Sequence, residues 1–302
     1  MQNVNYGSQG FRIEGTFDMG SQLKNIVCIL RETARKEFSV DNELYEKFSA
    51  HIGKFPCVII TPDDVQIITN GSEVRRRFID ALLCQLDARY MQSLMEYNKL
   101  LQQRNSLLKA FAERKQHDYN LLDVYDEQLV KAGNDVFGKR NFFLKDMLPV
   151  IKRFYSQIAG VEEPVEIKYE SQLQDASFER LLKQFRDRDL LLQRSTIGIH
   201  KDDIEMTMNG QPFKITASQG QRKSLLFALK LAEFEILKKE KGFAPILLLD
   251  DVFEKLDEIR MDNLLDWACI QNSGQIFITD THEERMKNHL GKLAVGYQLI
   301  NI

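Results

Sequence analysis

The stretch that decides the fold reads Leu247-Leu248-Leu249-Asp250-Asp251. Its apolar run, which begins at Ile246, predicts a buried strand, and Asp250 falls where that strand emerges at its C-terminal end. Ligands of α/β sheets bind at this end of the strands. A carboxylate here can hold magnesium through water, and Asp251 beside it can polarise an attacking water. The alternative is that the paired aspartates only end a strand and begin a turn.

A second informative stretch lies upstream and reads Ser218-Gln219-Gly220-Gln221-Arg222. It opens an amphipathic helix, and Ser218 and Gln221 have the spacing of an S-x-x-Q capping box. The remaining N–H groups and the positive end of the helix dipole then face whatever lies in front of the helix. Gly220 would let a phosphate approach the backbone closely. The alternative is a well-capped helix with a purely structural role.

Two further segments follow the apolar strand. Asp257 comes in Glu254-Lys255-Leu256-Asp257, and a second apolar strand, Gln275 to Thr279, ends near His282. Strands and helices alternate from Thr196 to Ile300, which predicts an α/β sheet. For His282 the alternative is a surface residue at the start of a helix.

In order and spacing, these segments resemble the signature loop, Walker B strand, D-loop and switch histidine of an ABC-type ATPase head. The resemblance implies catalytic roles for Asp250, Asp251 and His282, with Asp250 as the metal ligand. It implies ATP contacts from the remaining motif residues, which are Ser218, Gln219, Gly220, Gln221 and Asp257. The G-x-x-x-x-G-K-[ST] phosphate loop does not occur in the 302 residues, because the Gly-Lys pairs are followed by Phe55, Arg140 and Leu293.

The rest of the chain predicts a first lobe and a helical arm. Strands are expected at 11–17, 26–30, 56–61 and 165–169, with a helix from Glu43 to about Ile52 capped by Asn42. An apolar stripe predicts a long helix from Ser72 to about Gln116, which a kink could divide. A second long helix is expected from about Leu121 to Ile158 and a charged one at 178–192. We therefore predict a partial first lobe at 1–71, the arm at 72–160 and the C-terminal part of the head at 161–302.

Four segments identify a closer resemblance. They are Gly198-Ile199-His200-Lys201-Asp202-Asp203, Thr61-Pro62-Asp63-Asp64, Arg75-Arg76-Arg77-Phe78 and Gln103-Arg104-Asn105. Together with the two stretches above, they resemble the RecF family of bacterial DNA replication and repair proteins, from about Phe11 to Thr281. The resemblance implies an ABC-type α/β head with a mixed sheet, flanking helices and a helical arm. The N-terminal strand, Walker A loop and first helix of that family are not found in this sequence.

The RecF resemblance also implies a function. It implies a homodimer that sandwiches ATP and Mg²⁺, with Ser218, Gly220 and Gln221 acting on the nucleotide of the opposite subunit. It implies binding of single-stranded, gapped or junction DNA, recombination mediator partners, and a role in recombinational repair and the SOS response. Without a phosphate loop, we expect no ATP hydrolysis by this chain alone, and we expect Leu247 and Leu249 to lie at unpaired sheet edges. The alternatives are a non-enzymatic DNA-binding or scaffold fragment and, less favoured, another ABC-type head such as an SMC protein.

Composition constrains the DNA surface and the compartment. The net charge of −3 means that any DNA-binding surface is a local patch. The candidate residues are Arg75, Arg76, Arg77, Arg104 and Lys109. Such charges are more often a solvated helix face, and Glu73 with Arg77, or Arg76 with Asp80, can simply pair locally. The four cysteines match no metal-binding spacing and suit a reducing cytoplasm. No secretion signal or membrane-spanning run is expected.

Overall fold

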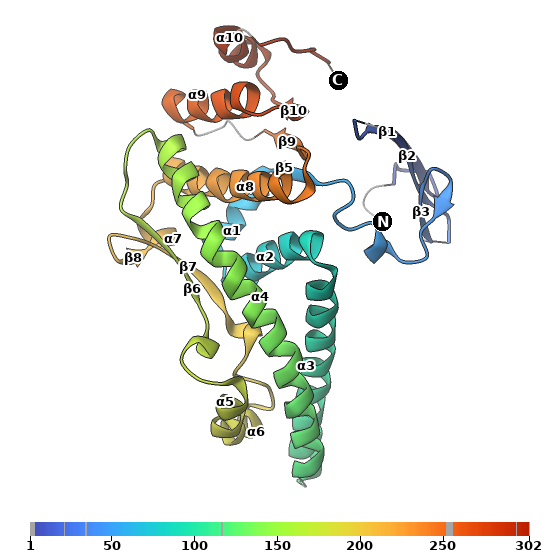
Figure 1. Ribbon diagram of the computed structural model, residues 1–302, viewed down its shortest axis with the longest axis vertical. Helices are drawn as coiled ribbons and strands as arrows, with labels where there is room; N and C mark the ends of the chain where they lie inside the picture. Colours follow the sequence, from blue (N-terminus) through green and yellow to red (C-terminus); the bar gives the residue numbers. More distant parts are fainter. Residues whose placement is uncertain are drawn as a thin grey trace. The chain divides into compact units, whose positions relative to one another are not determined.

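A computed structural model describes residues 4–20, 22–33, 35–115, 117–251, 256–293 and 295–301. The chain forms two compact units, Met1–Phe55 and Pro56–Ile302 (Figure 1). The helices of the predicted arm therefore belong to the same unit as the C-terminal part of the head. No helix among the described residues is both long and apolar enough to cross a membrane.

The first unit is an antiparallel sheet of four strands in sequential order. These are β1 (Phe11–Asp18), β2 (Leu23–Leu30), β3 (Lys36–Val40) and β4 (Glu43–Leu44). The helix predicted from Glu43 is wrong, because Asp41 and Asn42 take φ values of 52° and 68° and turn the chain from β3 into β4. Asp and Asn are the residues other than glycine that best tolerate this conformation. Only a short 3₁₀ turn, Phe48–Ala50, follows.

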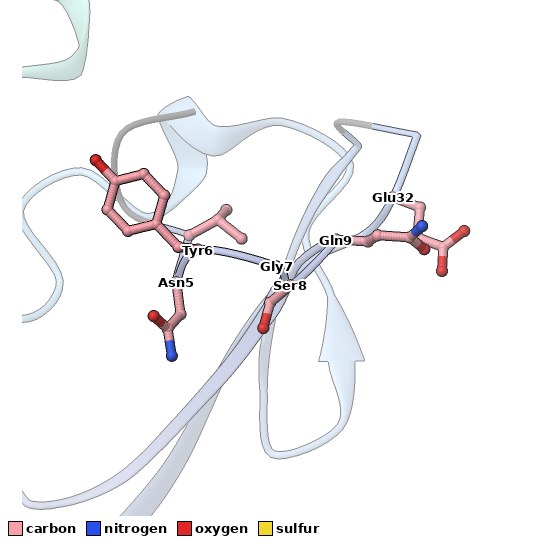
Figure 2. A pocket seen from close by; sticks show the side chains of 7 residues that line it. Asn5, Tyr6, Gly7, Ser8, Gln9 and Glu32 are labelled. Atoms are coloured by element: carbon pink, nitrogen blue, oxygen red, sulfur yellow. The ribbon is translucent and has the colours of Figure 1, made fainter.

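A surface hollow in this unit lies where the chain leads into β1. It is lined by Val4 to Gln9 and by Glu32, and Figure 2 shows the side chains of Tyr6, Gln9 and Glu32 around it. Gly7 has a φ of 85°, which permits the turn. None of the residues predicted from the sequence as functional lines this hollow.

The second unit is built around a parallel sheet in the order β10-β9-β5. Its strands are β5 (Cys57–Ile60), β9 (Ile246–Asp250) and β10 (Ile276–Thr279). The expectation for Leu247 and Leu249 is wrong, since β9 is paired on both sides and these side chains are 0% and 1% exposed. Among the described strands, β10 and β5 form the two edges of this sheet, where Phe277 and Ile59 are 48% and 46% exposed.

The predicted long helices are confirmed, with one break. The first helix divides into α2 (Ser72–Leu86) and α3 (Ala88–Arg114), because Asp87 adopts an extended conformation and caps α3 by accepting the N–H groups of Arg89 and Tyr90. The second is α4 (Tyr119–Ala159), which Gly160 ends with a φ of 70°. Figure 1 shows α3 and α4 side by side.

An antiparallel sheet and shorter helices complete this unit. The sheet contains β6 (Val165–Glu170), β7 (Asp203–Met208) and β8 (Gln211–Pro212). The predicted helix at 178–192 is instead two helices, α5 (Phe178–Gln184) and α6 (Arg186–Leu192), because Phe185 leaves the helical conformation. The remaining helices are α1 (Gln66–Thr69), α7 (Phe213–Thr216), α8 (Gln219–Lys241), α9 (Glu258–Asp266) and α10 (Glu283–Leu293). Helix α8 is buried along its middle, from Ser224 to Leu229, and contacts both α4 and β5.

Candidate functional site

The start of α8 has the capped geometry that its sequence predicts. Ser218 Oγ accepts the N–H of Gln221 at 3.2 Å, and Gln221 Oε1 accepts the N–H of Ser218 at 2.8 Å, which confirms the capping box. The N–H groups of Gln219 and Gly220 have no acceptor within the helix, as in any first turn. A β-carbon at Gly220 would have Ser218 Oγ, 4.0 Å away, as its nearest described neighbour. Nothing among the described residues crowds Gly220 on this side.

One carboxylate, Glu163, joins the start of α8 to the start of α9. It accepts hydrogen bonds from Gln221 Nε2 at 3.1 Å and from Arg260 Nη2 at 2.8 Å, and Tyr155 donates its hydroxyl to it. Arg260 in turn contacts Asp257 Oδ2 at 3.1 Å. The predicted motif residues Gln221 and Asp257 are thus held by one network.

Sequence reasoning missed Glu163 and Arg260. Their ion pair joins positions 97 residues apart, so no local pattern predicts it. Asp257 itself is the N-cap of α9 and accepts the N–H of Arg260 at 2.9 Å. The neighbouring motif residues Glu254 and Lys255 lie outside the described residues, as do Val252 and Phe253.

The ends of β9 and β10 bring the predicted catalytic residues to one edge of the parallel sheet. Asp250 is exposed, and its Oδ1 accepts the hydroxyl of Thr279 at 2.5 Å. Asp251 has a φ of 46° and donates its N–H to the carbonyl of Thr279 at 3.1 Å. His282 follows the end of β10, with its side chain 68% exposed. We call Asp250, Asp251 and His282 the strand-end edge.

The strand-end edge offers few metal ligands of its own. No group of three or more His, Cys, Asp or Glu residues that could hold a metal occurs in the described parts of the chain. Mg²⁺ is commonly bound by one or two carboxylates, with phosphates and water as its other ligands. The single exposed carboxylate of Asp250 fits that pattern.

The start of α8 and the end of β5 lie at different points along this helix. Lys230 of α8 is 3.7 Å from Asp64, which follows the end of β5. Gly220 comes ten residues earlier on the same helix, which is about 15 Å along the axis. The start of α8 is therefore about 15 Å along the helix axis from the point at which α8 passes the end of β5.

Arg104 is part of a closed cluster between α3, α4 and the chain after α6. Its guanidinium is 0% exposed and donates to Asp126 Oδ1 at 2.5 Å, Asp189 Oδ2 at 2.7 Å and Ser195 Oγ at 2.8 Å. The neighbouring Asn105 accepts the N–H of Ser195 at 2.7 Å. The Gln103-Arg104-Asn105 segment therefore locks α3 to the chain after α6. Burial removes Arg104 from the predicted DNA surface.

Arg140 on α4 forms a second buried cluster. It donates to both carboxylate oxygens of Asp80, at 3.0 and 2.9 Å, and to Asp202 Oδ2 at 3.0 Å. Tyr169 also donates to Asp202 Oδ2, at 2.6 Å, while burial raises the pKa of Asp202. Sequence reasoning missed Arg140 as a structural residue. We call the clusters around Arg104 and Arg140 the arm base.

The remaining arginines of the predicted DNA surface differ in exposure. Arg75 is buried and forms a two-point ion pair with Asp203, at 2.7 and 2.9 Å, which removes it from that surface. Arg76 is half-buried and donates to the carbonyl of Asp202 at 2.5 Å. Arg77 is exposed and pairs with Glu73, as the local alternative predicted, and Lys109 is exposed.

No protein-family model matches this chain, but known proteins are similar to it over its whole length. It is 40% identical to the DNA replication and repair protein RecF of Flavobacterium johnsoniae over 302 residues, which is 100% of this chain and 84% of that protein. It is 42% identical to RecF of Cytophaga hutchinsonii over 251 residues, covering 83% of this chain and 67% of that protein.

Solved structures give the same result. The structure of the recombination mediator protein RecF-ATP in the RecFOR pathway matches with a TM-score of 0.80 and 28% identity, over 93% of this chain and 77% of that one. The RecF-ATPrS structure matches with a TM-score of 0.79 and the same identity. The predicted ABC-type α/β head with long helices is confirmed. The chain belongs to the RecF family of DNA replication and repair proteins.

Proposed function

We propose that this protein binds DNA in recombinational repair and the SOS response, as a dimer that encloses nucleotide between two copies. The observation that supports the dimer is the distance of about 15 Å along α8 between Gly220 and Lys230, which lies near the end of β5 in the same sheet as the strand-end edge. In this arrangement, the N–H groups of Gln219 and Gly220 bind the phosphate that is held by the opposite copy. Single-stranded, gapped or junction DNA is the proposed substrate, and recombination mediator proteins are the proposed partners.

The nucleotide in this proposal is ATP, with Mg²⁺. A solved relative is described as RecF-ATP, which supports this choice. Asp250 would hold the metal, which supplies charge neutralisation between phosphates when bound. Asp251 would orient a water, and His282 would face the terminal phosphate from the end of β10. Glu163 keeps Gln221 and Asp257 in place for the same nucleotide.

We propose that the 302-residue chain alone does not hydrolyse ATP. A phosphate loop supplies a cradle of backbone N–H groups and a lysine, and no such motif occurs in this sequence. The test is magnesium-dependent phosphate release by the purified chain, with Asp251→Asn as the control. Turnover by the wild-type chain that Asp251→Asn abolishes would refute this part of the proposal.

DNA binding is tested separately by fluorescence anisotropy with labelled single-stranded, gapped and duplex DNA. We expect binding that weakens steeply with salt, because phosphate contacts release counterions. The experiment is repeated with ATP and Mg²⁺, and sedimentation reports whether a dimer forms. DNA binding that ATP does not change would favour the alternative function, a non-enzymatic DNA-binding or scaffold protein. The free state of all four cysteines is consistent with the proposed cytoplasmic location.

A further inference from the structure

Three basic side chains gather where the Gly198–Asp203 segment meets α2. Arg76 donates from Nη1 to the carbonyl of Asp202 at 2.5 Å, which places it beside Lys201. The ring of His200 donates from Nε2 to the carbonyl of Ser195 at 3.2 Å, and the positive charges of Arg194 and Arg76 act on Lys201. Lys201 and Arg194 are exposed and Arg76 is half-buried. We call Arg76, Arg194 and Lys201 the basic cluster.

The carboxylates around the basic cluster are already engaged by other cations. Asp203 is paired with Arg75, Asp202 with Arg140 and Asp189 with Arg104. Glu73, the other acidic neighbour of Arg76, is paired with Arg77. Among the described residues, no ion pair joins a carboxylate to Arg76, Arg194 or Lys201. The basic cluster therefore carries a surplus of positive charge.

The ionisation of neighbouring groups agrees with this surplus. The pKa of Lys201 is lowered, first by burial and then by the positive charges of Arg194 and Arg76. Tyr97 donates its hydroxyl to His200 Nδ1 at 2.7 Å, and burial lowers the pKa of His200 to about 4. His200 is therefore neutral at physiological pH and holds the segment in place without adding charge.

We propose that Arg76, Arg194 and Lys201 bind phosphate groups of the DNA backbone. An anion placed among three mutually repelling cations relieves their repulsion, and guanidinium groups match the geometry of phosphate oxygens. The inference rests on the DNA-binding function proposed above. It adds Arg194 and Lys201 to the predicted DNA surface. Arg75 and Arg104, in contrast, are buried in ion pairs inside the protein.

The test is the double variant Arg194→Gln, Lys201→Gln, because both side chains are exposed and neither forms a described ion pair. Binding of duplex DNA is measured by anisotropy over a series of salt concentrations. Each lost phosphate contact lowers the slope of log affinity against log salt by about 0.9, so we expect a decrease of about 1.8. Adding Arg76→Gln should lower the slope by about 0.9 more.

The matched control is Lys214→Gln, Lys239→Gln, which removes the same charge from exposed positions on α7 and α8. Thermal unfolding of each variant checks that the fold is retained. If wild type binds DNA and the double variant keeps the wild-type slope, the basic cluster does not contact DNA, although the proposed function stands. An equal decrease in the control would also overturn the inference. Failure of wild type to bind DNA at low salt would refute both.

Discussion

The arm base and the strand-end edge both carry charged residues in motif-like segments, yet the charges are buried and paired in the first region and exposed in the second. At the arm base, Arg104 and Arg140 are 0% and 3% exposed, and each is held by carboxylates from distant parts of the chain. At the strand-end edge, Asp250 is exposed and His282 is 68% exposed at its side chain. The charges of the arm base are neutralised by partners inside the protein, whereas those of the strand-end edge remain accessible to a ligand.

This comparison shows that a charged motif does not by itself mark a binding site. Burying an arginine is tolerable only if carboxylates and hydrogen bonds replace its water, which fixes the surrounding backbone. An exposed carboxylate at a strand end carries no such constraint. We therefore expect substitutions at the arm base to act on stability and substitutions at the strand-end edge to act on binding.

The largest expected effect is that of Arg140→Met. It leaves Asp80 and Asp202 buried without their main cation, so the free energy of unfolding should fall by about 3–5 kcal/mol. Urea unfolding followed by circular dichroism measures the change. Arg77→Met is the matched control, since its pair with Glu73 is exposed and worth at most about 1 kcal/mol. If both substitutions had the same effect, the buried ion pairs of Arg140 would not contribute more to stability than the exposed pair of Arg77.

Glu233 on α8 extends the comparison, because it is buried without a close ion pair or a full set of hydrogen bonds. It is 7% exposed, Lys230 lies 3.7 Å away, and its Oε2 has no hydrogen-bond partner among the described residues. Burial raises its pKa to about 7. Its contribution to stability is therefore complete below its unfolded pKa, near 4.5, and is lost as the pH rises through about 7.

Glu233→Gln should therefore stabilise the protein above pH 7 by on the order of 2 kcal/mol, with little change near pH 4. Urea unfolding of the variant and wild type across this pH range gives the difference. Comparing the two proteins is necessary because His200, whose pKa is lowered to about 4, makes wild type more stable as the pH rises from about 4 to 6.5. Glu240→Gln, at an exposed position of α8, should show no such pH-dependent difference.

A smaller effect is expected for Ser218→Ala at the start of α8. Loss of the hydroxyl that accepts the Gln221 N–H should lower the free energy of unfolding by about 1 kcal/mol. Thermal or urea unfolding measures it. Ser106→Ala is the control, because Ser106 lies on the exposed face inside α3 and caps nothing. A loss as large at Ser106 would mean that the cap does not explain the effect.

The smallest effect on stability is expected for Asp250→Asn. The amide oxygen can still accept the Thr279 hydroxyl, and the side chain is exposed, so the free energy of unfolding should change by less than about 0.5 kcal/mol. Magnesium-dependent nucleotide affinity of the dimer, measured by calorimetry, should fall. A large loss of stability would show that Asp250 has a structural role, like the arginines of the arm base.

Local signals explain what could be predicted from the sequence. The capping box at Ser218, the apolar run ending at Asp250 and the helix end at Gly160 each depend on neighbours within a few residues. A break in the first long helix was expected without its position at Asp87. The break at Phe185 and the tight turn at Asn42 were not predicted. Apolar periodicity continues across the first two positions, and Asn42 has the chemistry of a helix cap as well as of a turn.

The sequence by itself determined the resemblance to the RecF family, the long helices, and local features such as the capping box at Ser218 and the strand that ends at Asp250. Only the tertiary structure decided which charges are structural, because Arg104, Arg140 and Glu163 meet charged partners that are 22 to 97 residues away. Exposure and pairing arise when distant segments pack together, so residues of the same type in adjacent motifs can end in the interior or at the surface.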